Sequence, residues 1–572
     1  MKALSVFGVL VLARICVLAD GKLGNSSALL AGLWNDAIVA LAFATLEAIL
    51  YKNVRLVAAV YCALVGFIAI NVPIARLTSS PLTVQMLRAT GSALTDSITH
   101  YVTFTNVALM TIIALAGALL PLVFRRRPVR LPRVALVSIV VVCAAGALPS
   151  TRAVSRGYER NAITALVASM FPRMRARPAL ADWRVSAFAY DDDPALVDLQ
   201  GGAAGRNVVL IALESTGAQY LRPYGATLDP MPNLTALADR AILFENAYAV
   251  YPESIKGLFS VLCSTYPSFD TRPEDYGRVT TPSIAQVLRD EGYRTALFHS
   301  GRFMYLGMRS IIDGRGFEIL EDAGHVGGNH NSSFGVDEPS TVKRMLRWTA
   351  SLRADERFFL FYLPIAGHHP YETPEPGPFR GDDEQERYLN ALNYSDASVA
   401  ELIRGLQAQG RDTNTLFVIY GDHGEAFGQH DGNFGHTFFL YEENVRVPLL
   451  ITAPGLITRP VRVQNPASLV DIAPTISALL GLSCGSWQGT ALLDPRPRAA
   501  LFFTDYSLPL IGVRDGPWKF ICDASGRSPQ LFNVAADCGE TRSLAEGYAL
   551  QVAGYSERLN AWAAAQKALL KP

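Results

Sequence analysis

Three side chains that commonly bind divalent cations each follow an apolar run of the chain. Glu214 comes directly after one run, and the adjacent pair Asp422 and His423 comes after another. A divalent cation binds such oxygen and nitrogen donors at about 2.0–2.2 Å, and a catalytic site keeps one position for an exchangeable group. Two carboxylates and an imidazole therefore predict a catalytic metal centre, although a single Glu after a strand is more often a solvated residue.

The segment from Tyr251 to Ser260 supplies a nucleophile for such a centre. Ser254 is predicted to begin a helix, where the positive end of the helix dipole favours an alkoxide that also binds the metal. Lys256 lies two residues further on and is predicted to neutralise an oxyanion on a phosphoryl group. The alternative is that Ser254 only caps the helix and that Lys256 is a surface charge.

Five of the nine histidines occur near these segments. His423, His430 and His436 lie close together, and His368 and His369 form an adjacent pair. Histidines this dense outside a strand core predict metal binding or proton transfer, with a solvated loop position as the alternative for His430 and His436. Neighbouring side chains of an extended backbone point to opposite sides, so we expect His369 to be structural.

The elements that must position these residues alternate between strand and helix. Helical periodicity at 281–291 and 397–409 separates several short apolar runs, which is typical of an α/β fold with a mainly parallel sheet and helices on both faces. The runs are Asn207–Leu213, Thr295–Phe298, Phe358–Tyr362, Leu416–Tyr420 and Val447–Thr452. In such sheets ligands bind at the carboxyl ends of the strands. Glu214, His368 and Asp422 each follow a strand, so we expect them to meet.

The first 150 residues predict a bundle of about five transmembrane helices. Each of five apolar stretches approaches the ~20 residues that a helix needs to cross a bilayer. They lie near 3–19, 27–50, 55–76, 103–124 and 134–150. We therefore expect an anchor at 1–150, a linker at the membrane surface at 151–204, and a catalytic domain at 205–572.

Charge predicts the orientation of this anchor. Residues 1–150 carry 12 Lys/Arg and 4 Asp/Glu, and five arginines cluster between Arg125 and Arg133. Cationic loops stay in the cytoplasm, which predicts a multi-pass protein of a bacterial-type cytoplasmic (inner) membrane with its catalytic domain outside, on the periplasmic side. Asp36 and Glu47 are costly in hydrocarbon, and we expect them to pair helices or lie at an interface.

The composition argues against several other classes of protein. Apolar residues make up 50% and charged residues 18%, which argues against a disordered chain. After residue 150 the charges are 39 Lys/Arg and 47 Asp/Glu without a basic patch, so nucleic acid is not an expected partner. The absence of a Cys-x-x-Cys motif disfavours thiolate zinc sites. Cys263, Cys484, Cys522 and Cys538 allow three pairings if that side of the membrane is oxidising. Cys522 and Cys538 flank a predicted hairpin, so a disulfide between them is the pairing we favour.

Residues 205–545 resemble the sulfatase-like branch of the alkaline phosphatase superfamily. The motifs are Gly421–Glu425, Tyr441–Glu443 followed by Arg446–Pro448, and Gly512–Lys519. The Cys/Ser-x-Pro-x-Arg motif of true sulfatases is missing at Ser254–Leu258. The metal residues are closest to the pattern of lipoteichoic acid synthases and phosphoethanolamine transferases, which also carry five membrane helices.

The resemblance implies a site and a reaction. Glu214, Ser254, Asp422 and His423 would hold one divalent ion, zinc or manganese, with a possible second ion. His368, His436 and Arg302 would bind substrate. The implied enzyme is a phosphotransferase or phosphodiesterase in the lipid bilayer, which moves a head group from a phospholipid or other phosphodiester to an envelope glycan or lipid acceptor through a phosphoserine.

Two alternatives remain open. One is a sulfuric or phosphoric ester hydrolase with two metals, in which His368 and His436 bind the second ion. The other is a membrane-bound binding or scaffolding protein that has lost turnover. The complete Glu, Ser, Asp and His set argues against the second alternative.

Overall fold

The computed structural model describes residues 2–18, 26–78, 80–89, 102–126, 160–171, 183–184, 186–329, 335–381, 383–483 and 485–569. The chain divides into two compact units. The helical unit comprises Met1–Arg173 with the short segments Gly428–Phe434 and Tyr506–Leu508, and the remaining residues form the α/β unit.

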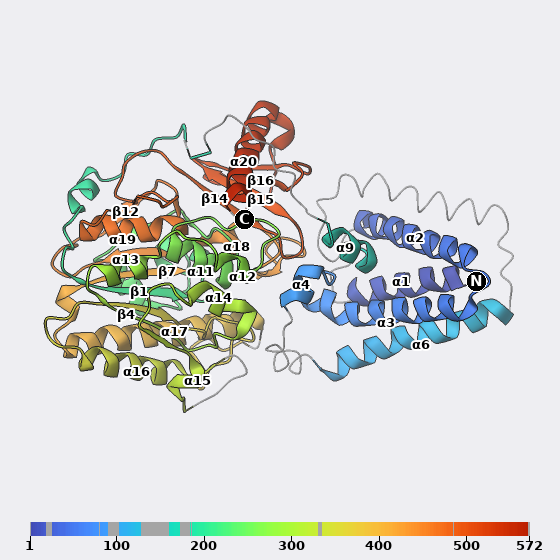
Figure 1. The fold of residues 1–572 in the computed structure, drawn as a ribbon. Helices are drawn as coiled ribbons and strands as arrows, with labels where there is room; N and C mark the ends of the chain where they lie inside the picture. Colours follow the sequence, from blue (N-terminus) through green and yellow to red (C-terminus); the bar gives the residue numbers. More distant parts are fainter. Residues whose placement is uncertain are drawn as a thin grey trace. The chain divides into compact units, whose positions relative to one another are not determined.

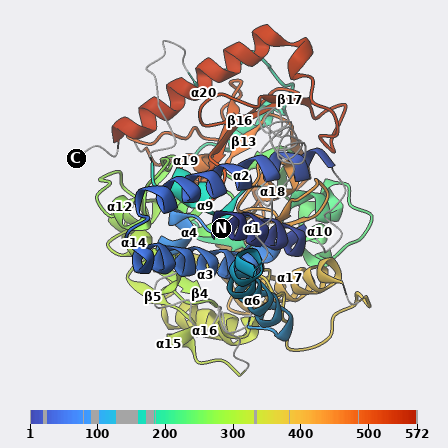
Figure 2. The same cartoon turned by 90° about the vertical axis from the view of Figure 1, so that its right-hand side faces the viewer.

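Four long helices lie alongside one another in the helical unit (Figures 1 and 2). They are α1 (Lys2–Leu18), α2 (Ser26–Ile49), α3 (Val54–Thr78) and α6 (Phe104–Arg126), and two short helices, α4 (Val84–Ala89) and α9 (Ala162–Ser169), accompany them. Val6, Val9 and Ile68 are among the buried residues between the long helices. Apolar residues therefore lie both between the helices of the bundle and on its outer surface.

Three helices among the described residues are long and apolar enough to cross a membrane, which is fewer than the five expected. They are Gly32–Ile49, Val54–Thr78 and Phe104–Phe124. The first predicted stretch forms α1, whose 17 residues span about 26 Å, short of the ~30 Å hydrocarbon core. The fifth stretch, 134–150, lies outside the described residues, as does much of the arginine cluster, so the orientation stays a prediction.

A buried ion pair joins the first two helices. Asp36 accepts hydrogen bonds from Arg14 Nε at 2.9 Å and Arg14 Nη2 at 2.8 Å. Asn161, the N-cap of α9, donates to the same carboxylate at 2.7 Å. Asp36 thus pairs helices, as expected from the cost of a lone charge in an apolar bundle.

An eight-stranded sheet forms the centre of the α/β unit. Five neighbouring strands are parallel, in the spatial order β7 (Thr415–Gly421), β1 (Asn207–Leu213), β6 (Phe358–Leu363), β4 (Arg294–His299) and β5 (Ile319–Glu321). Beyond β7 lie β11 (Leu449–Thr452), β2 (Ile242–Phe244) and β12 (Val461–Val463). The prediction of a mainly parallel sheet is confirmed, with the difference that β11 runs antiparallel to β7.

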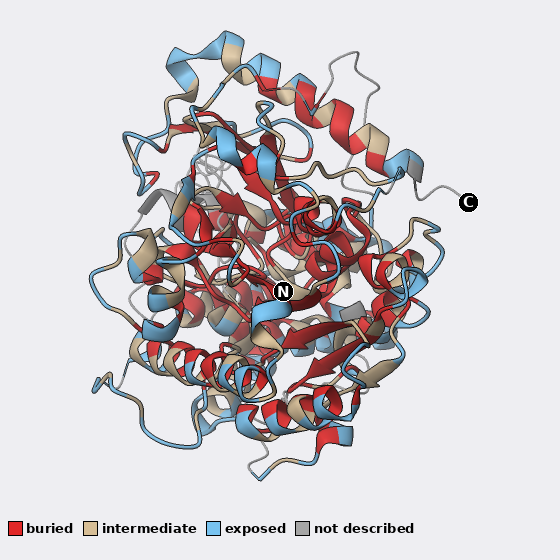
Figure 3. Cartoon of the chain, turned by 90° about the vertical axis from the view of Figure 1, so that its left-hand side faces the viewer, coloured by how far each residue is buried: buried red, intermediate tan, exposed pale blue. Residues whose placement is uncertain are grey.

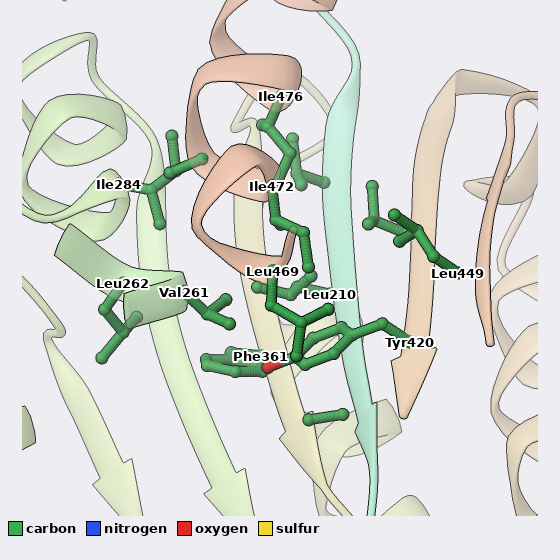
Figure 4. Close-up of a cluster of buried hydrophobic side chains, with 14 of the residues drawn as sticks. Leu210, Val261, Leu262, Ile284, Phe361, Tyr420, Leu449, Leu469, Ile472 and Ile476 are labelled. Carbon is green, nitrogen blue, oxygen red and sulfur yellow. The ribbon is translucent and has the colours of Figure 1, made fainter. Parts of the chain in front are cut away.

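Helices cover both faces of this sheet (Figure 1). One face packs against α11 (Ser254–Cys263), α13 (Ile284–Asp290), α14 (Met308–Ile312) and α19 (Ile472–Leu480), and Figure 4 shows part of this core. The other face packs against α10 (Pro232–Ala238), α16 (Glu338–Ser351) and α17 (Glu384–Ala408). In β1, Val208 and Leu210 lie in the first core and Val209 and Ile211 in the second, which explains its unbroken apolar run. Figure 3 shows that most strands of this unit are buried.

Smaller elements complete the unit. An antiparallel sheet of β14 (Ala499–Thr504), β15 (Leu510–Asp515), β16 (Trp518–Asp523) and β17 (Gln530–Asn533) packs against α20 (Ala549–Leu569). A three-stranded sheet contains β10 (Arg446–Val447), β3 (Ala247–Tyr248) and β13 (Ala467–Ser468), and β8 (Ala426–Phe427) pairs with β9 (Phe434–Gly435). Short helices are α12 (Pro273–Tyr276), α15 (Ala323–Val326) and α18 (Glu442–Val445).

The predicted disulfide between Cys522 and Cys538 is wrong, because both are free thiols. Cys522 lies in β16 and points into the buried core beneath the C-terminal sheet, whereas Cys538 is exposed in the turn after β17. The two side chains therefore occupy different environments, although their positions in the sequence flank a hairpin.

Candidate metal-dependent active site

The structure brings Glu214, Ser254, Asp422 and His423 together at the carboxyl edge of the parallel sheet. Glu214 follows β1, Asp422 and His423 follow the neighbouring strand β7, and Ser254 is the first residue of α11. Ser254 Oγ lies 2.7 Å from Asp422 Oδ2, 3.0 Å from Glu214 Oε2 and 3.3 Å from His423 Nε2. One hydroxyl thus contacts all three predicted ligands.

The spacing of these donor atoms suits a metal ion. His423 Nε2 lies 3.6 Å from Glu214 Oε1 and 3.5 Å from Asp422 Oδ2. Donors at about 2.0–2.2 Å in a tetrahedral site are separated by about 3.4 Å. The donor set therefore fits one divalent cation, with Ser254 Oγ as the fourth donor.

Ser215 orients both carboxylates and was not predicted from the sequence. Its backbone N–H donates to Asp422 Oδ1 at 2.9 Å, and its hydroxyl donates to Glu214 Oε1 at 3.1 Å. His423 N also donates to Asp422 Oδ1, at 2.8 Å, so that Oδ2 faces Ser254. Ser215 adopts a left-handed φ of 53°, and Tyr388 donates its hydroxyl to the Ser215 carbonyl at 2.7 Å.

The capping of α11 leaves the nucleophile available. Glu253, rather than Ser254, is the N-cap, and its carboxylate accepts hydrogen bonds from Ile255 N at 3.0 Å and Lys256 N at 3.4 Å. Ser254 therefore occupies the first turn of the helix, with its hydroxyl directed to the ligands. The alternative that Ser254 is only a helix cap does not describe this geometry.

Lys256 has a different partner from the predicted one. Its Nζ donates to Asp505 Oδ1 at 2.8 Å, and both side chains are buried. Tyr251 donates its hydroxyl to the same oxygen at 2.8 Å. The ammonium thus joins the first turn of α11 to the residue that follows β14, and its action on a substrate oxyanion stays a prediction.

His436 lies beside the metal residues. Its ring stacks on His423 with the centroids 4.0 Å apart, and its Nδ1 lies 2.8 Å from Glu425 Oε2. Burial alone would lower the pKa of His436, but the Glu425 carboxylate raises it above the usual value. His423, Glu425 and His436 form a second group that could hold an ion. Sequence reasoning missed Glu425, although the residue lies only two positions after His423.

The other predicted residues lie outside the two candidate ion groups. His368 is absent from both candidate ion groups, and burial lowers its pKa to about 4, so its imidazole is neutral at pH 7. His369 contacts Glu384 Oε1 through Nε2 at 3.0 Å, consistent with the structural role expected for it. Arg302 is half-buried after β4. His430 is half-buried in the segment that groups with the helical unit.

The site concentrates negative charge. Burial, and then the Asp422 carboxylate, raise the pKa of Glu214 well above its usual value. Burial lowers the pKa of His423, which keeps the imidazole in the neutral form that binds metals. A divalent cation would relieve the repulsion between the two carboxylates, so the electrostatics and the donor spacing agree.

Comparisons with known proteins identify the domain. The sulfatase family model matches residues 206–482. Lipoteichoic acid synthase 2 of Bacillus subtilis is 23% identical over 329 residues, which cover 53% of this chain and 49% of that protein. Choline-sulfatase of Rhizobium meliloti is 25% identical over 439 residues, 59% of this chain and 82% of that protein. The chain spans about half the length of the lipoteichoic acid synthase relatives.

Solved structures share the fold. A lipoteichoic acid synthase from Listeria monocytogenes superposes with a TM-score of 0.53 at 20% identity, covering 65% of this chain and 93% of that one. A phosphonate monoester hydrolase of Agrobacterium radiobacter gives a TM-score of 0.50 at 18% identity, covering 64% and 96%.

The α/β unit thus has the fold of the alkaline phosphatase superfamily, and the predicted resemblance is confirmed. Residues 206–482 match the sulfatase family model. The chain is similar both to lipoteichoic acid synthases and to sulfatases.

Proposed function

We propose that the protein is a membrane-anchored, metal-dependent phosphotransferase or phosphodiesterase with Ser254 as its nucleophile. The donor is a phospholipid or another phosphodiester, and the acceptor is an envelope glycan or lipid. The observation that carries the proposal is the position of Ser254 Oγ, within 3.3 Å of donor atoms of Glu214, Asp422 and His423. A hydroxyl in that position can serve both as a ligand and as an attacking group.

The reaction proceeds in two steps. Glu214, Asp422 and His423 would hold a divalent cation, which would lower the pKa of the Ser254 hydroxyl. Ser254 Oγ attacks the phosphorus, the bond to the lipid alcohol breaks, and a phosphoserine remains. His436, whose pKa Glu425 raises, donates a proton to the departing alkoxide. His368, which is neutral, takes the proton of the acceptor hydroxyl or of water, and the head group leaves Ser254.

The apolar helices support a membrane location. Three described helices are long and apolar enough to span a bilayer. An anchor at 1–150 and a linker at 151–204 would hold a catalytic domain at 205–572 beside a lipid-borne donor at high effective concentration. We place that domain on the outer face of the cytoplasmic membrane, where envelope acceptors lie.

Ester hydrolysis with two metals is the second candidate. The group of His423, Glu425 and His436 favours it, because these ligand atoms lie within 4.8 Å of one another. The choline-sulfatase relative favours it as well. Metal analysis of the purified protein separates the two candidates: one ion per chain supports the phosphotransferase, and two ions support the hydrolase.

Mass spectrometry of the detergent-solubilised protein tests the main proposal. After incubation with phosphatidylglycerol and rapid acid quenching, we expect a phosphate-containing adduct on the peptide with Ser254 and none in Ser254→Ala. The adduct mass identifies the transferred group. A sulfate adduct after incubation with a sulfate ester, together with no phosphate adduct from any phosphodiester, would contradict the proposal.

A further inference from the structure

Glu338 is a buried carboxylate directly behind the loop that carries His368. It is the first residue of α16, and its side chain is 1% exposed. The loop runs from the end of β6 at Leu363 to the His369–Pro370 bond. Neither the metal residues nor the proposed reaction uses Glu338, although burying a carboxylate is costly unless other groups compensate for it.

Four groups donate hydrogen bonds to this carboxylate, and two of them belong to the loop. Ile365 N donates to Oε1 at 2.9 Å and also to Ser300 Oγ at 2.8 Å. Ala366 N donates to the same carboxylate oxygen at 3.1 Å. Ser300 Oγ also donates to Oε1, at 2.8 Å, and Tyr362 OH donates to Oε2. Consecutive backbone N–H groups bonded to one oxygen determine the backbone conformation at 365–366, because leaving either N–H unpaired in a buried position costs free energy.

The same loop contacts the metal site. His368 N donates to the Ile365 carbonyl at 2.9 Å, so the conformation at Ile365 sets the start of the His368 segment. A Cβ atom at Gly367 would lie 2.1 Å from the Glu214 carbonyl oxygen. The loop therefore packs against the backbone of a metal residue, with no room for a side chain at Gly367. A change in the backbone conformation at 365–366 would therefore move His368 and displace the backbone of Glu214.

Among the residues that the structure describes, the groups that face Glu338 are neutral or acidic. Tyr362 of β6 and Tyr394 of α17 are phenols, and Tyr394 OH accepts the Glu338 N–H at 3.0 Å. Asp337 on its own helix and Glu401 of α17 are the nearby charged groups that act on these phenols, and both are acidic. Burial raises the pKa of Glu338 to about 7, since only dipoles stabilise its charge.

We propose that Glu338 is a positioning residue: its ionised carboxylate holds the Ile365 and Ala366 amides and thereby places His368 against the metal site. A protonated carboxyl group accepts these amides less strongly, so the loop loosens as Glu338 takes up a proton. The effect on the loop is independent of the reaction, whereas its effect on turnover rests on the proposed function.

Hydrogen exchange measures the loop directly. In the full-length, detergent-solubilised protein, we expect the Ile365 and Ala366 amides, corrected for their intrinsic rates, to lose protection as the pH falls through about 7. In Glu338→Gln we expect protection to be at least about tenfold lower at pH 8 and independent of pH. Glu401→Gln is the matched control, because it removes a nearby carboxylate that does not bond to the loop, and it should behave as the wild type.

Ser300→Ala provides a second variant if Glu338→Gln does not fold. Loss of a donor to the ionised carboxylate should move the midpoint of Ala366 protection to higher pH, because the charged form is then less stabilised. The midpoint is measured at Ala366 because Ser300 Oγ also accepts the Ile365 N–H. With bis(p-nitrophenyl) phosphate as the probe, we expect Glu338→Gln to lower kcat about tenfold, because a displaced His368 takes the proton of the attacking water less efficiently.

The outcomes are distinct. Unchanged protection in Glu338→Gln together with an unshifted midpoint in Ser300→Ala overturns the positioning role. Altered protection in a protein that turns over no phosphodiester supports the positioning role and contradicts the proposed function. A decrease in kcat with unchanged KM and unchanged protection also overturns the inference, because it would indicate an effect that does not pass through the loop.

Discussion

Ser254 Oγ lies 2.7 Å from Asp422 Oδ2, although 168 positions separate the two residues in the chain. Ser254 belongs to α11, which covers one face of the sheet, and Asp422 follows β7 within the sheet. Their contact therefore depends on the packing of α11 against the sheet, through residues such as Val261 and Leu262 (Figure 4). A fragment that lacks either element cannot form this site.

Replacement of the nucleophile should abolish turnover. In Ser254→Ala we expect kcat to fall by about 1,000-fold or more, with the melting temperature within a few degrees of the wild type, because the change removes only a hydroxyl. Ser260→Ala is the control, since Ser260 lies on the same helix and bonds only to the Lys256 carbonyl. Wild-type turnover in Ser254→Ala would show that another group attacks the substrate.

Metal binding should stabilise the protein more at higher pH. Without a cation, burial and Asp422 raise the pKa of Glu214, so the folded state holds a proton that the unfolded state releases near pH 4.5. Stability of the metal-free protein therefore falls as the pH rises from 4.5 towards the raised pKa. A cation displaces that proton and removes the penalty.

Calorimetry with and without Mn²⁺ or Zn²⁺ measures whether metal-induced stabilisation increases with pH. At a concentration 100-fold above Kd, the ion should add about 2.7 kcal/mol, and the shift in melting temperature should grow between pH 5 and pH 7. Asp422→Asn should lose most of the shift. A metal-induced shift that is larger at pH 5 than at pH 7 would exclude Glu214 as a ligand.

Ser215 should control metal affinity without contacting the ion. Ser215→Gly keeps the left-handed backbone and the N–H bond to Asp422 but removes the hydroxyl that holds Glu214. We expect affinity to weaken about tenfold, as for other groups that orient a ligand. Ser215→Ala should bind at least as weakly and should unfold at a lower temperature than Ser215→Gly, because alanine, unlike glycine, is strained at this φ. Titration calorimetry measures both affinities.

The Lys256–Asp505 pair can be tested by double substitution. Removing one partner leaves a buried charge, and Lys256→Met should cost about 3–5 kcal/mol of stability. Lys256→Met combined with Asp505→Asn should recover much of that loss. If Lys256 only positions α11, the double variant also recovers activity. Recovery of stability without activity would instead support the predicted action of Lys256 on the substrate oxyanion.

Much of the sheet could be predicted because its strands are buried on both faces. The apolar runs of β1, β6 and β7 do not alternate with polar residues, and polar residues follow each run. The sequence therefore predicted both where these strands end and which site residues follow them. The antiparallel direction of β11 was not visible, since an apolar run carries no information about the direction of its neighbour.

Other features depend on contacts that the sequence does not contain. The role of Ser215 comes from a left-handed φ next to Asp422, and that of Glu425 comes from its approach to His436. Lys256 could not be assigned because its partner, Asp505, lies 249 positions away. Cys522 and Cys538 suggested a pair by spacing alone, which does not report which way each side chain points.

The buried pair of Arg14 and Asp36 affects how the helical unit can be made. Each charge, presented alone to hydrocarbon at a helix centre, costs about 2.5–3.5 kcal/mol. The first helix leaves the ribosome before the second, so its arginine has no partner until Asp36 has been synthesised. We therefore expect the short helix α1 to enter the apolar phase only when paired with α2, and translation past Asp36 to be required for stable membrane association of the amino terminus.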